Sequence, residues 1–292
     1  MPYAVLIDTT KCIGCRSCQV SCKQWNDLPA ERTQIEGRTT GFQNPAALSA
    51  KTLTMVTNKE VEDANAPGGL RWVFAKRQCM HCEEPACAAA CPVTALHKTK
   101  EGPVTYDSKK CIGCRYCVWA CPFGVPTADW DSLAPKIHKC TMCFNRVTAQ
   151  DAPAELNGKA LTNDEKKVFA ESQGKPACVK ACTTGGLKFG DREKLLAEAW
   201  DRIKSSSGKY VGKVFGEKEV GGTSVLYLSS VPFEKLGFRT DLGERAYPHY
   251  SKIALGVVSP AVMGLGGLLA AVYLLKQRKA AVSDADLKGK KE

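Results

Sequence analysis

The sequence of 292 residues is short of acidic side chains, because 30 Asp and Glu stand against 41 Lys and Arg and leave a formal net charge of +11. It lacks a recognised nucleic-acid-binding motif to accompany this charge, so we expect no nucleic-acid partner. It also lacks an identifiable catalytic acid, base or substrate pocket, so we expect a non-catalytic chain that binds no small-molecule substrate directly. Disorder is excluded as the main state, because 44% of the residues are hydrophobic and can form a core.

Cysteine is the residue in excess. The chain has 16 cysteines, whereas disulfide scaffolds of that richness are usually short secreted chains. Residues 11–22 and 110–121 agree at eight of twelve positions, which indicates an internal repeat. The cysteines fall into four motifs with none left over: Cys12, Cys15, Cys18 and Cys22; Cys79, Cys82, Cys87 and Cys91; Cys111, Cys114, Cys117 and Cys121; and Cys140, Cys143, Cys178 and Cys182.

The spacing of these cysteines is typical of iron-sulfur ligation. Three thiolates two residues apart can wrap one loop around three corners of a 4Fe-4S cubane, while the fourth thiolate, three residues on, binds the neighbouring cluster. The four motifs therefore predict four 4Fe-4S clusters in two two-cluster units. A zinc site needs only two pairs of ligands, and Cys12, Cys15 and Cys18 are too close together for separate disulfides. Pro92 and Pro122 follow the last cysteine of the second and third motifs, as in bacterial ferredoxins.

The fold class predicted is α+β, with two ferredoxin-like two-cluster units plus one C-terminal transmembrane helix. Strands are expected at residues 3–8, 71–76 and 102–107, and a helix is expected from Asp191 to Lys204, with Asp191 as N-cap and Trp200 in the core. Residues 147–174 are expected to face solvent. The predicted regions are 1–190 (a double ferredoxin-like region), 191–252 (a helix and connecting segment), 253–275 (a transmembrane helix) and 276–292 (a basic cytoplasmic tail). Within the first region, unit one combines 1–25 with 136–190, unit two is 71–135, and 26–70 is an inserted surface segment.

Residues 253–275 contain no charged residue in 23 and as a helix would extend about 35 Å, enough to cross a bilayer core. A buried core helix is the alternative. Small residues four apart, such as Gly267 and Ala271, would permit contact with another membrane subunit. The flanking cations are Lys276, Arg278, Lys279, Lys288 and Lys290 after the segment, against Arg239, Arg245 and Lys252 before it.

This charge bias places the tail in the cytoplasm and the cluster region on the periplasmic side of the inner membrane. Since no signal peptide precedes the first predicted strand, such a region would be exported already folded, with a partner that carries the signal. Retention of the cluster region in the cytoplasm is the alternative.

The cysteine motifs and their surroundings resemble the iron-sulfur subunits of the molybdopterin oxidoreductase family, and within it the beta subunit of membrane-bound respiratory formate dehydrogenase. The segments that carry the resemblance are I-D-T-T-K-C-I-G-C from Ile7, N-P-A-A-L-S-A-K from Asn44, C-M-H-C-E-E-P-A-C from Cys79, K-C-T-M-C from Lys139 and V-G-G-T from Val220. The resemblance implies a subunit that relays electrons from a molybdenum- or tungsten-pterin catalytic subunit to a membrane cytochrome b subunit and quinone. The gap between Cys143 and Cys178 is longer than in the family.

The resemblance also implies nested ligand sets, in which the last cysteine of each motif binds with another motif. These sets are Cys12, Cys15, Cys18 and Cys182; Cys140, Cys143, Cys178 and Cys22; Cys79, Cys82, Cys87 and Cys121; and Cys111, Cys114, Cys117 and Cys91. The residues alone do not exclude sequential pairing, of motif one with two and three with four.

Two other functions remain as alternatives. One is the same electron relay in a hydrogenase, polysulfide, nitrite or dimethyl sulfoxide reductase complex. The other is a non-redox protein in which the clusters only hold the fold together. Several side chains near the ligands have expected roles. Arg16, Arg115 and Lys139 raise cluster potentials or, as the alternative, are solvated surface groups. His81 and His138 pack or hydrogen-bond rather than ligate, and Tyr116 and Trp119 pack against a cluster, with stepwise electron hopping as the alternative.

Overall fold

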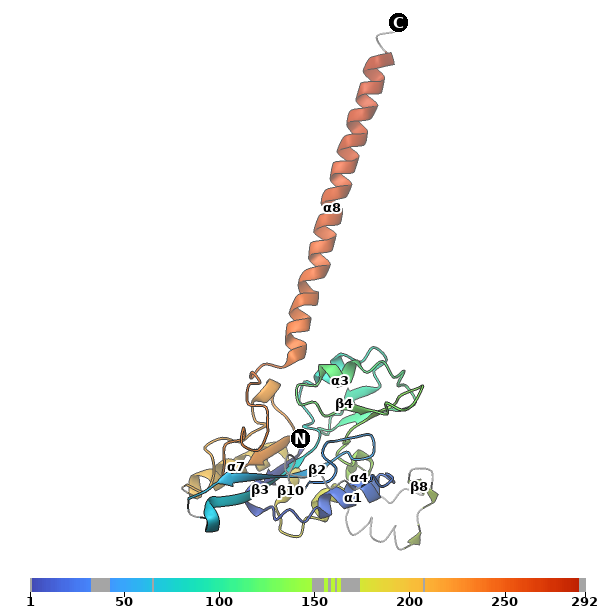
Figure 1. The fold of residues 1–292 in the computed structure, drawn as a ribbon. Helices are drawn as coiled ribbons and strands as arrows, with labels where there is room; N and C mark the ends of the chain where they lie inside the picture. Colours follow the sequence, from blue (N-terminus) through green and yellow to red (C-terminus); the bar gives the residue numbers. More distant parts are fainter. Residues whose placement is uncertain are drawn as a thin grey trace. The chain divides into compact units, whose positions relative to one another are not determined.

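A computed structural model describes residues 2–32, 43–64, 66–148, 155–156, 159–160, 162–163, 174–206 and 208–288. It divides into two units, Met1–Ala246 and Tyr247–Glu292, and each is described by itself. Figure 1 shows the elements of both units.

A three-stranded sheet lies at the centre of the first unit. Its middle strand is β1 (Tyr3–Asp8), which pairs antiparallel with β10 (Leu187–Asp191) and parallel with β11 (Val225–Leu228). Every residue of β11 is buried, as expected for a strand covered on both faces. β11 comes from the predicted connecting segment 191–252, and residues 191–246 of that segment belong to the same compact unit as the cysteine motifs.

One face of this sheet is covered by α7 (Arg192–Ser205). Its buried residues Leu195 and Ala199 pack with Leu6 and other sheet residues. The Asp191 carboxylate accepts a hydrogen bond from the Lys194 amide at 3.1 Å, which satisfies a free donor at the helix start. The predicted helix and its cap are therefore confirmed, and Trp200 packs against this face as expected.

The opposite face carries an aromatic core. The rings of Phe215, Tyr227 and Phe238 lie within 4.9 to 6.2 Å of one another between centroids. Against this core packs the hairpin of β2 (Met55–Glu62) and β3 (Leu70–Arg77), in which Val56 and Val73 are buried.

The prediction that 26–70 forms an inserted surface segment is wrong for its second half. Residues Thr52 to Val56 are all buried, and β2 is the antiparallel partner of β3 along its full length. The mixture of Pro, Gly, Thr and Asn suggested a surface segment, but the hydroxyl of Thr57 donates to the Ala75 carbonyl at 3.1 Å. Polar side chains can enter a core when such bonds satisfy them.

Short elements hold the cysteine motifs. The helix α1 (Ser17–Trp25) contacts α6 (Ala177–Lys180), and α2 (Ala86–Ala89) contacts α3 (Tyr116–Ala120). Figure 1 shows α3 at one end of this unit and α1 at the other. The remaining elements are η1 (Thr9–Lys11), η2 (Pro67–Gly69), η3 (Glu219–Gly221), α4 (Phe144–Thr148), and the hairpins β4 (Leu96–Lys98) with β5 (Val104–Tyr106), β6 (Thr127–Ala128) with β7 (Ile137–His138), and β8 (Glu155–Leu156) with β9 (Lys159–Ala160).

The three strands predicted before the motifs are found as β1, β3 and β5. The predicted solvent-facing insertion 147–174 lies mostly outside the described residues. The fold class is confirmed as mixed α and β with ferredoxin-like cysteine loops.

The second unit is the single helix α8 (Tyr247–Lys288), which contains Pro260. It is longer than the predicted span 253–275 and includes all of it. Over Tyr247–Lys279 it is long and apolar enough to cross a membrane, and its apolar window is not buried against any described residue.

Candidate iron-sulfur sites

The fold gathers the sixteen free thiols into four groups of four, here called the first to fourth quartets. Each combines three cysteines of one motif with the last cysteine of another. Cys12, Cys15, Cys18 and Cys182 line one opening and form the first quartet. Cys91, Cys111, Cys114 and Cys117 line a second opening and form the fourth. The second quartet is formed by Cys22, which interacts electrostatically with Cys140, Cys143 and Cys178. The third quartet is formed by Cys82, which interacts in the same way with Cys79, Cys87 and Cys121.

The structure thus places motif one beside motif four and motif two beside motif three. Strand pairing explains this arrangement, because β1 leads into motif one while β10 follows directly after motif four, and the two strands are antiparallel neighbours. The contact between α2 and α3 joins the other two motifs in the same way.

All four motifs share one unusual backbone conformation. The residue before the second cysteine has a positive φ in each: 71° at Gly14, 50° at His81, 74° at Gly113 and 57° at Met142. Non-glycine residues seldom adopt this conformation, and it allows successive amides to point into one concave side of a loop. At Met142 the amide donates to the Cys140 Sγ at 3.3 Å.

A second turn recurs after the last cysteine of three motifs. Thr94, Gly124 and Gly185, each three residues beyond that cysteine, have φ values of 51°, 63° and 63°. Gly185 makes this turn although no proline follows Cys182, so the proline is not required for it. Motif one departs from the pattern, because Cys22 lies within α1 and the helix continues to Trp25.

The quartets differ in exposure and stand next to one another in order. Only Cys15 of the first quartet and Cys114 of the fourth are exposed, while the other fourteen thiols are buried or partly buried. Thiols of adjacent quartets interact electrostatically, as Cys18 does with Cys178, Cys140 with Cys79, and Cys87 with Cys117. The arrangement is therefore a row whose two ends reach the surface.

Burial dominates the acid-base properties of the inner thiols. It raises the pKa of Cys18 and of Cys140 to about 11, so these groups would be protonated at neutral pH unless a cation compensates the thiolate. Iron ligation supplies that compensation, because a coordinating thiol is deprotonated. At the surface, hydrogen bonds from Ser17 lower the pKa of Cys15.

The sites fit a cluster better than a single ion. Within the described ranges, no three His, Cys, Asp or Glu side chains converge on one ion position, whereas a structural zinc site needs four close ligands. Two buried donors also point to an acceptor beyond the protein: Arg115 Nε and His81 Nε2 have no hydrogen-bond partner among the described residues. Arg115 lines the opening of the fourth quartet, where an anionic cluster would accept its hydrogen bond.

His81 is a fully buried group of motif two, as expected for a residue that packs rather than ligates. Its Nδ1 accepts from the Val104 amide at 3.0 Å, so the neutral ring carries its proton on Nε2. Its carbonyl oxygen accepts from the Ser224 amide at 3.0 Å and from Lys98 Nζ at 3.3 Å.

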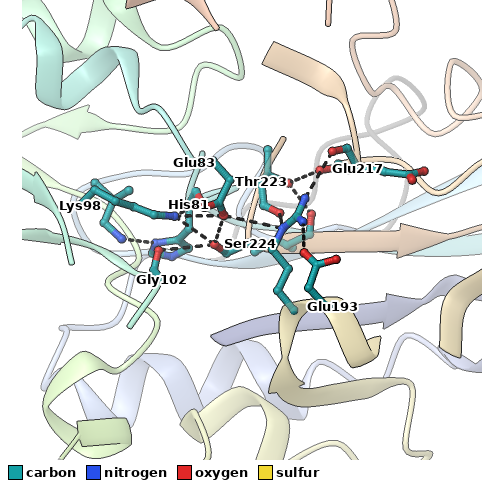
Figure 2. A network of polar contacts seen from close by, with 12 residues as sticks. His81, Glu83, Lys98, Gly102, Glu193, Glu217, Thr223 and Ser224 are labelled. Atoms are coloured by element: carbon teal, nitrogen blue, oxygen red, sulfur yellow. Dashed lines mark hydrogen bonds and ion pairs between the residues drawn. The ribbon is translucent and has the colours of Figure 1, made fainter. Parts of the chain in front are cut away.

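These bonds belong to a polar network that Figure 2 shows around motif two. Glu83 accepts from Lys98 Nζ at 3.2 Å and from the Ser224 hydroxyl at 2.8 Å, and its amide donates to the Gly222 carbonyl at 2.9 Å. The network ties the cysteine loop to the V-G-G-T segment, which has positive φ values from Val220 to Gly222. Sequence reasoning did not assign this function, although it singled out the V-G-G-T letters.

The other predicted residues lie as follows. Arg16 lines the opening of the first quartet. Lys139 is buried and donates to the carbonyls of Val104 and Cys140 at 2.5 and 3.0 Å. Tyr116 and Trp119, which are expected to pack against a cluster, are 63% and 83% exposed among the described residues, and their packing against a cluster stays a prediction.

Ferredoxin-like cysteine loops that place thiols in a row of quartets define the class of multicluster iron-sulfur proteins. In agreement, residues 11–95 and 70–162 each match the 4Fe-4S dicluster domain family. Two such domains give four 4Fe-4S clusters, in keeping with the 16 cysteines.

Similarity to individual proteins identifies a narrower family within this class. The chain is 36% identical to the iron-sulfur subunit of the nitrate-inducible formate dehydrogenase of Escherichia coli K12 over 229 residues, which cover 77% of this chain and 67% of that protein. It is 34% identical to the hydrogenase-2 operon protein HybA of Escherichia coli O157:H7 over 262 residues, 80% and 71% of the two chains. A protein of Nitratidesulfovibrio vulgaris is 39% identical over 96% of this chain and 68% of its own length. The chain belongs to the family of formate dehydrogenase iron-sulfur subunits and their relatives, and is an iron-sulfur electron-transfer subunit.

Proposed function

We propose that this chain carries electrons from the molybdenum- or tungsten-pterin catalytic subunit of a respiratory formate dehydrogenase to a membrane cytochrome b subunit. The cytochrome b subunit then passes them to quinone. The observation that carries the proposal is the row of quartets with an exposed thiol only at its two ends, Cys15 and Cys114. Such a row offers an entry and an exit to redox partners while it keeps the inner sites from solvent. The likeness to formate dehydrogenase subunits supports the choice of substrate.

We further propose that each quartet binds one 4Fe-4S cluster, which gives the nested ligand sets. The grouping of the thiols supports this assignment, and a pairwise test can decide it. Under nested pairing, Cys15→Ser and Cys182→Ser should alter the same electron paramagnetic resonance (EPR) signal. Under sequential pairing, Cys15→Ser should instead share its signal with Cys91→Ser, a result that would overturn the proposal.

The helix α8 is proposed to anchor the subunit in the inner membrane by a single pass. The cations that follow its apolar segment support a cytoplasmic tail and a periplasmic cluster region. The small residues of the segment favour contact with a second membrane subunit.

A hydrogenase complex is the second candidate. The alignment to HybA covers 80% of this chain against 77% for the formate dehydrogenase subunit, so the comparisons favour neither complex by extent alone. The two candidates share the same relay and differ only in the enzyme that supplies the electrons.

The native complex can decide between them. It would be extracted in mild detergent from the source membranes, its subunits identified, and its iron and sulfide counted. We expect clusters that bleach when formate is added under anaerobic conditions, together with a pterin-bearing subunit. Bleaching by hydrogen alone would establish the alternative, and clusters that neither substrate reduces would refute both.

A further inference from the structure

A buried cation stands close to two of the quartets. Lys76 lies in β3 and is 2% exposed. Its ammonium group donates a hydrogen bond to the side-chain oxygen of Gln78, which is neutral. Among the described residues, no carboxylate oxygen lies within ion-pairing distance of Lys76 Nζ. A buried charge that lacks an opposite charge is strongly unfavourable, so the position calls for an anion that the protein itself does not provide.

The thiols identify that anion. Lys76 lines the opening of the first quartet together with Cys12 and Cys182. It also interacts electrostatically with Cys18 of the first quartet and with Cys178 and Cys140 of the second. One ammonium group therefore lines the opening of the first quartet and interacts electrostatically with thiols of the second. Lys98, the comparable lysine beside the third quartet, already has Glu83 as its partner at 3.2 Å.

We propose that Lys76 is the shared counter-charge of the clusters held by the first and second quartets, and that it raises the reduction potentials of both. The inference rests on the proposed ligand sets. Reduction adds one electron to a cluster without making or breaking a bond, and a nearby positive charge stabilises the reduced form in a low-dielectric interior. Lys76 is thus a positioning residue of the relay, because its charge sets the reduction potentials of the clusters at one end of the row of quartets.

The test is a redox titration of the complete, cluster-loaded chain, followed by EPR. Lys76→Met keeps the length of the side chain and removes its charge. We expect the reduction equilibrium constant of two clusters to fall at least tenfold, which for a one-electron couple is a shift of 59 mV to lower potential, while the other two clusters keep their potentials. Lys76→Arg should retain the wild-type values.

Two further variants keep the test decisive. If Lys76→Met fails to assemble its clusters, Gln78→Glu places a carboxylate beside the ammonium, and it should lower the same two potentials. Lys98→Met is the matched control, because its charge is already paired, and it should leave the first two clusters unchanged.

Four unchanged potentials, or equal shifts in all four, would overturn the inference. So would a shift confined to the signals that respond to Cys114→Ser. None of these outcomes depends on which substrate reduces the complex, so failure of the formate assignment remains distinguishable. Failure of the ligand sets would appear separately in the paired cysteine variants.

Discussion

Replacing Gly113 by alanine should weaken the third cysteine loop far more than the same replacement at Gly68. Gly14, Gly68 and Gly113 have nearly equal φ values of 71°, 76° and 74°, so an added side chain strains the backbone equally at all three. Their surroundings differ. A Cβ on Gly113 would lie 2.6 Å from the Pro135 carbonyl oxygen, one on Gly14 would lie 2.6 Å from the Phe74 ring, and one on Gly68 would meet nothing within 4 Å.

The magnitudes follow from these contacts. The left-handed conformation costs a non-glycine residue about 1–2 kcal/mol, and this is the whole effect expected at Gly68. Overpacking adds roughly 1–3 kcal/mol. This overpacking cost should be near the upper end of its range at Gly113, where the added Cβ would meet a backbone oxygen. It should be near the lower end at Gly14, where the Phe74 ring can turn aside.

The assay is the rate at which the clusters bleach when the purified, loaded protein is exposed to a chaotrope. Since about 1.4 kcal/mol corresponds to a factor of ten, Gly113→Ala should lose iron roughly ten to a hundred times faster than Gly68→Ala, with Gly14→Ala between them. Equal rates for the three variants would refute the reasoning, because they would show that the close contacts contribute nothing.

Three more predictions concern the rest of the chain. Leu195→Ala should destabilise the cluster unit by about 2–5 kcal/mol through the cavity that it leaves under α7, and Leu196→Ala, only partly buried, should cost less in the same thermal-denaturation measurement. Burial tends to raise the pKa of Glu198, but hydrogen bonds from Lys188 and Arg202 outweigh it and lower the pKa below the ordinary 4.5; its stabilising effect is then present above that pH and lost as the pH falls through the lowered value. Glu198→Gln should therefore reduce the melting temperature at neutral pH and leave it unchanged in strong acid, and a constant difference at all pH values would contradict this assignment. A fluorescent protein fused behind the last residue should fluoresce in the cytoplasm, and periplasmic phosphatase activity from the same position would reverse the proposed orientation.

The chemistry of the sites could be predicted from the sequence, but the grouping of the thiols could not. Spacing alone identifies which three cysteines share a loop, because those distances are fixed by a few residues of backbone. Which motif supplies the fourth thiol depends on the pairing of β1 with β10, which join residues 3–8 to 187–191. No local pattern encodes a contact over such a separation, and both pairings therefore remained open.

The error over 26–70 has a different cause. A strand was missed because β2 reads M-V-T-N-K-E-V-E, with polar residues at positions that turn out to be buried. The amide of Val56 donates to the Gln19 side chain at 3.2 Å, a bond from strand to helix that composition cannot reveal. Buried polar residues of this kind lower the apparent hydrophobicity of a strand without excluding it from the core.

The same principle explains why Lys76 was missed, although three other cations near ligands were identified. Arg16, Arg115 and Lys139 are next to cysteines in the sequence, whereas Lys76 precedes Cys79 by three residues and yet interacts electrostatically with thiols of the first and second quartets. In an ordinary hairpin an inward position would carry an aliphatic side chain. Here clusters occupy part of the interior. Because a cluster is anionic, an inward position beside it favours a cation instead of an aliphatic side chain. The hydrophobic pattern of β3 could therefore be interpreted correctly only after the quartets were known, because the cofactor changes which side chains belong in the core.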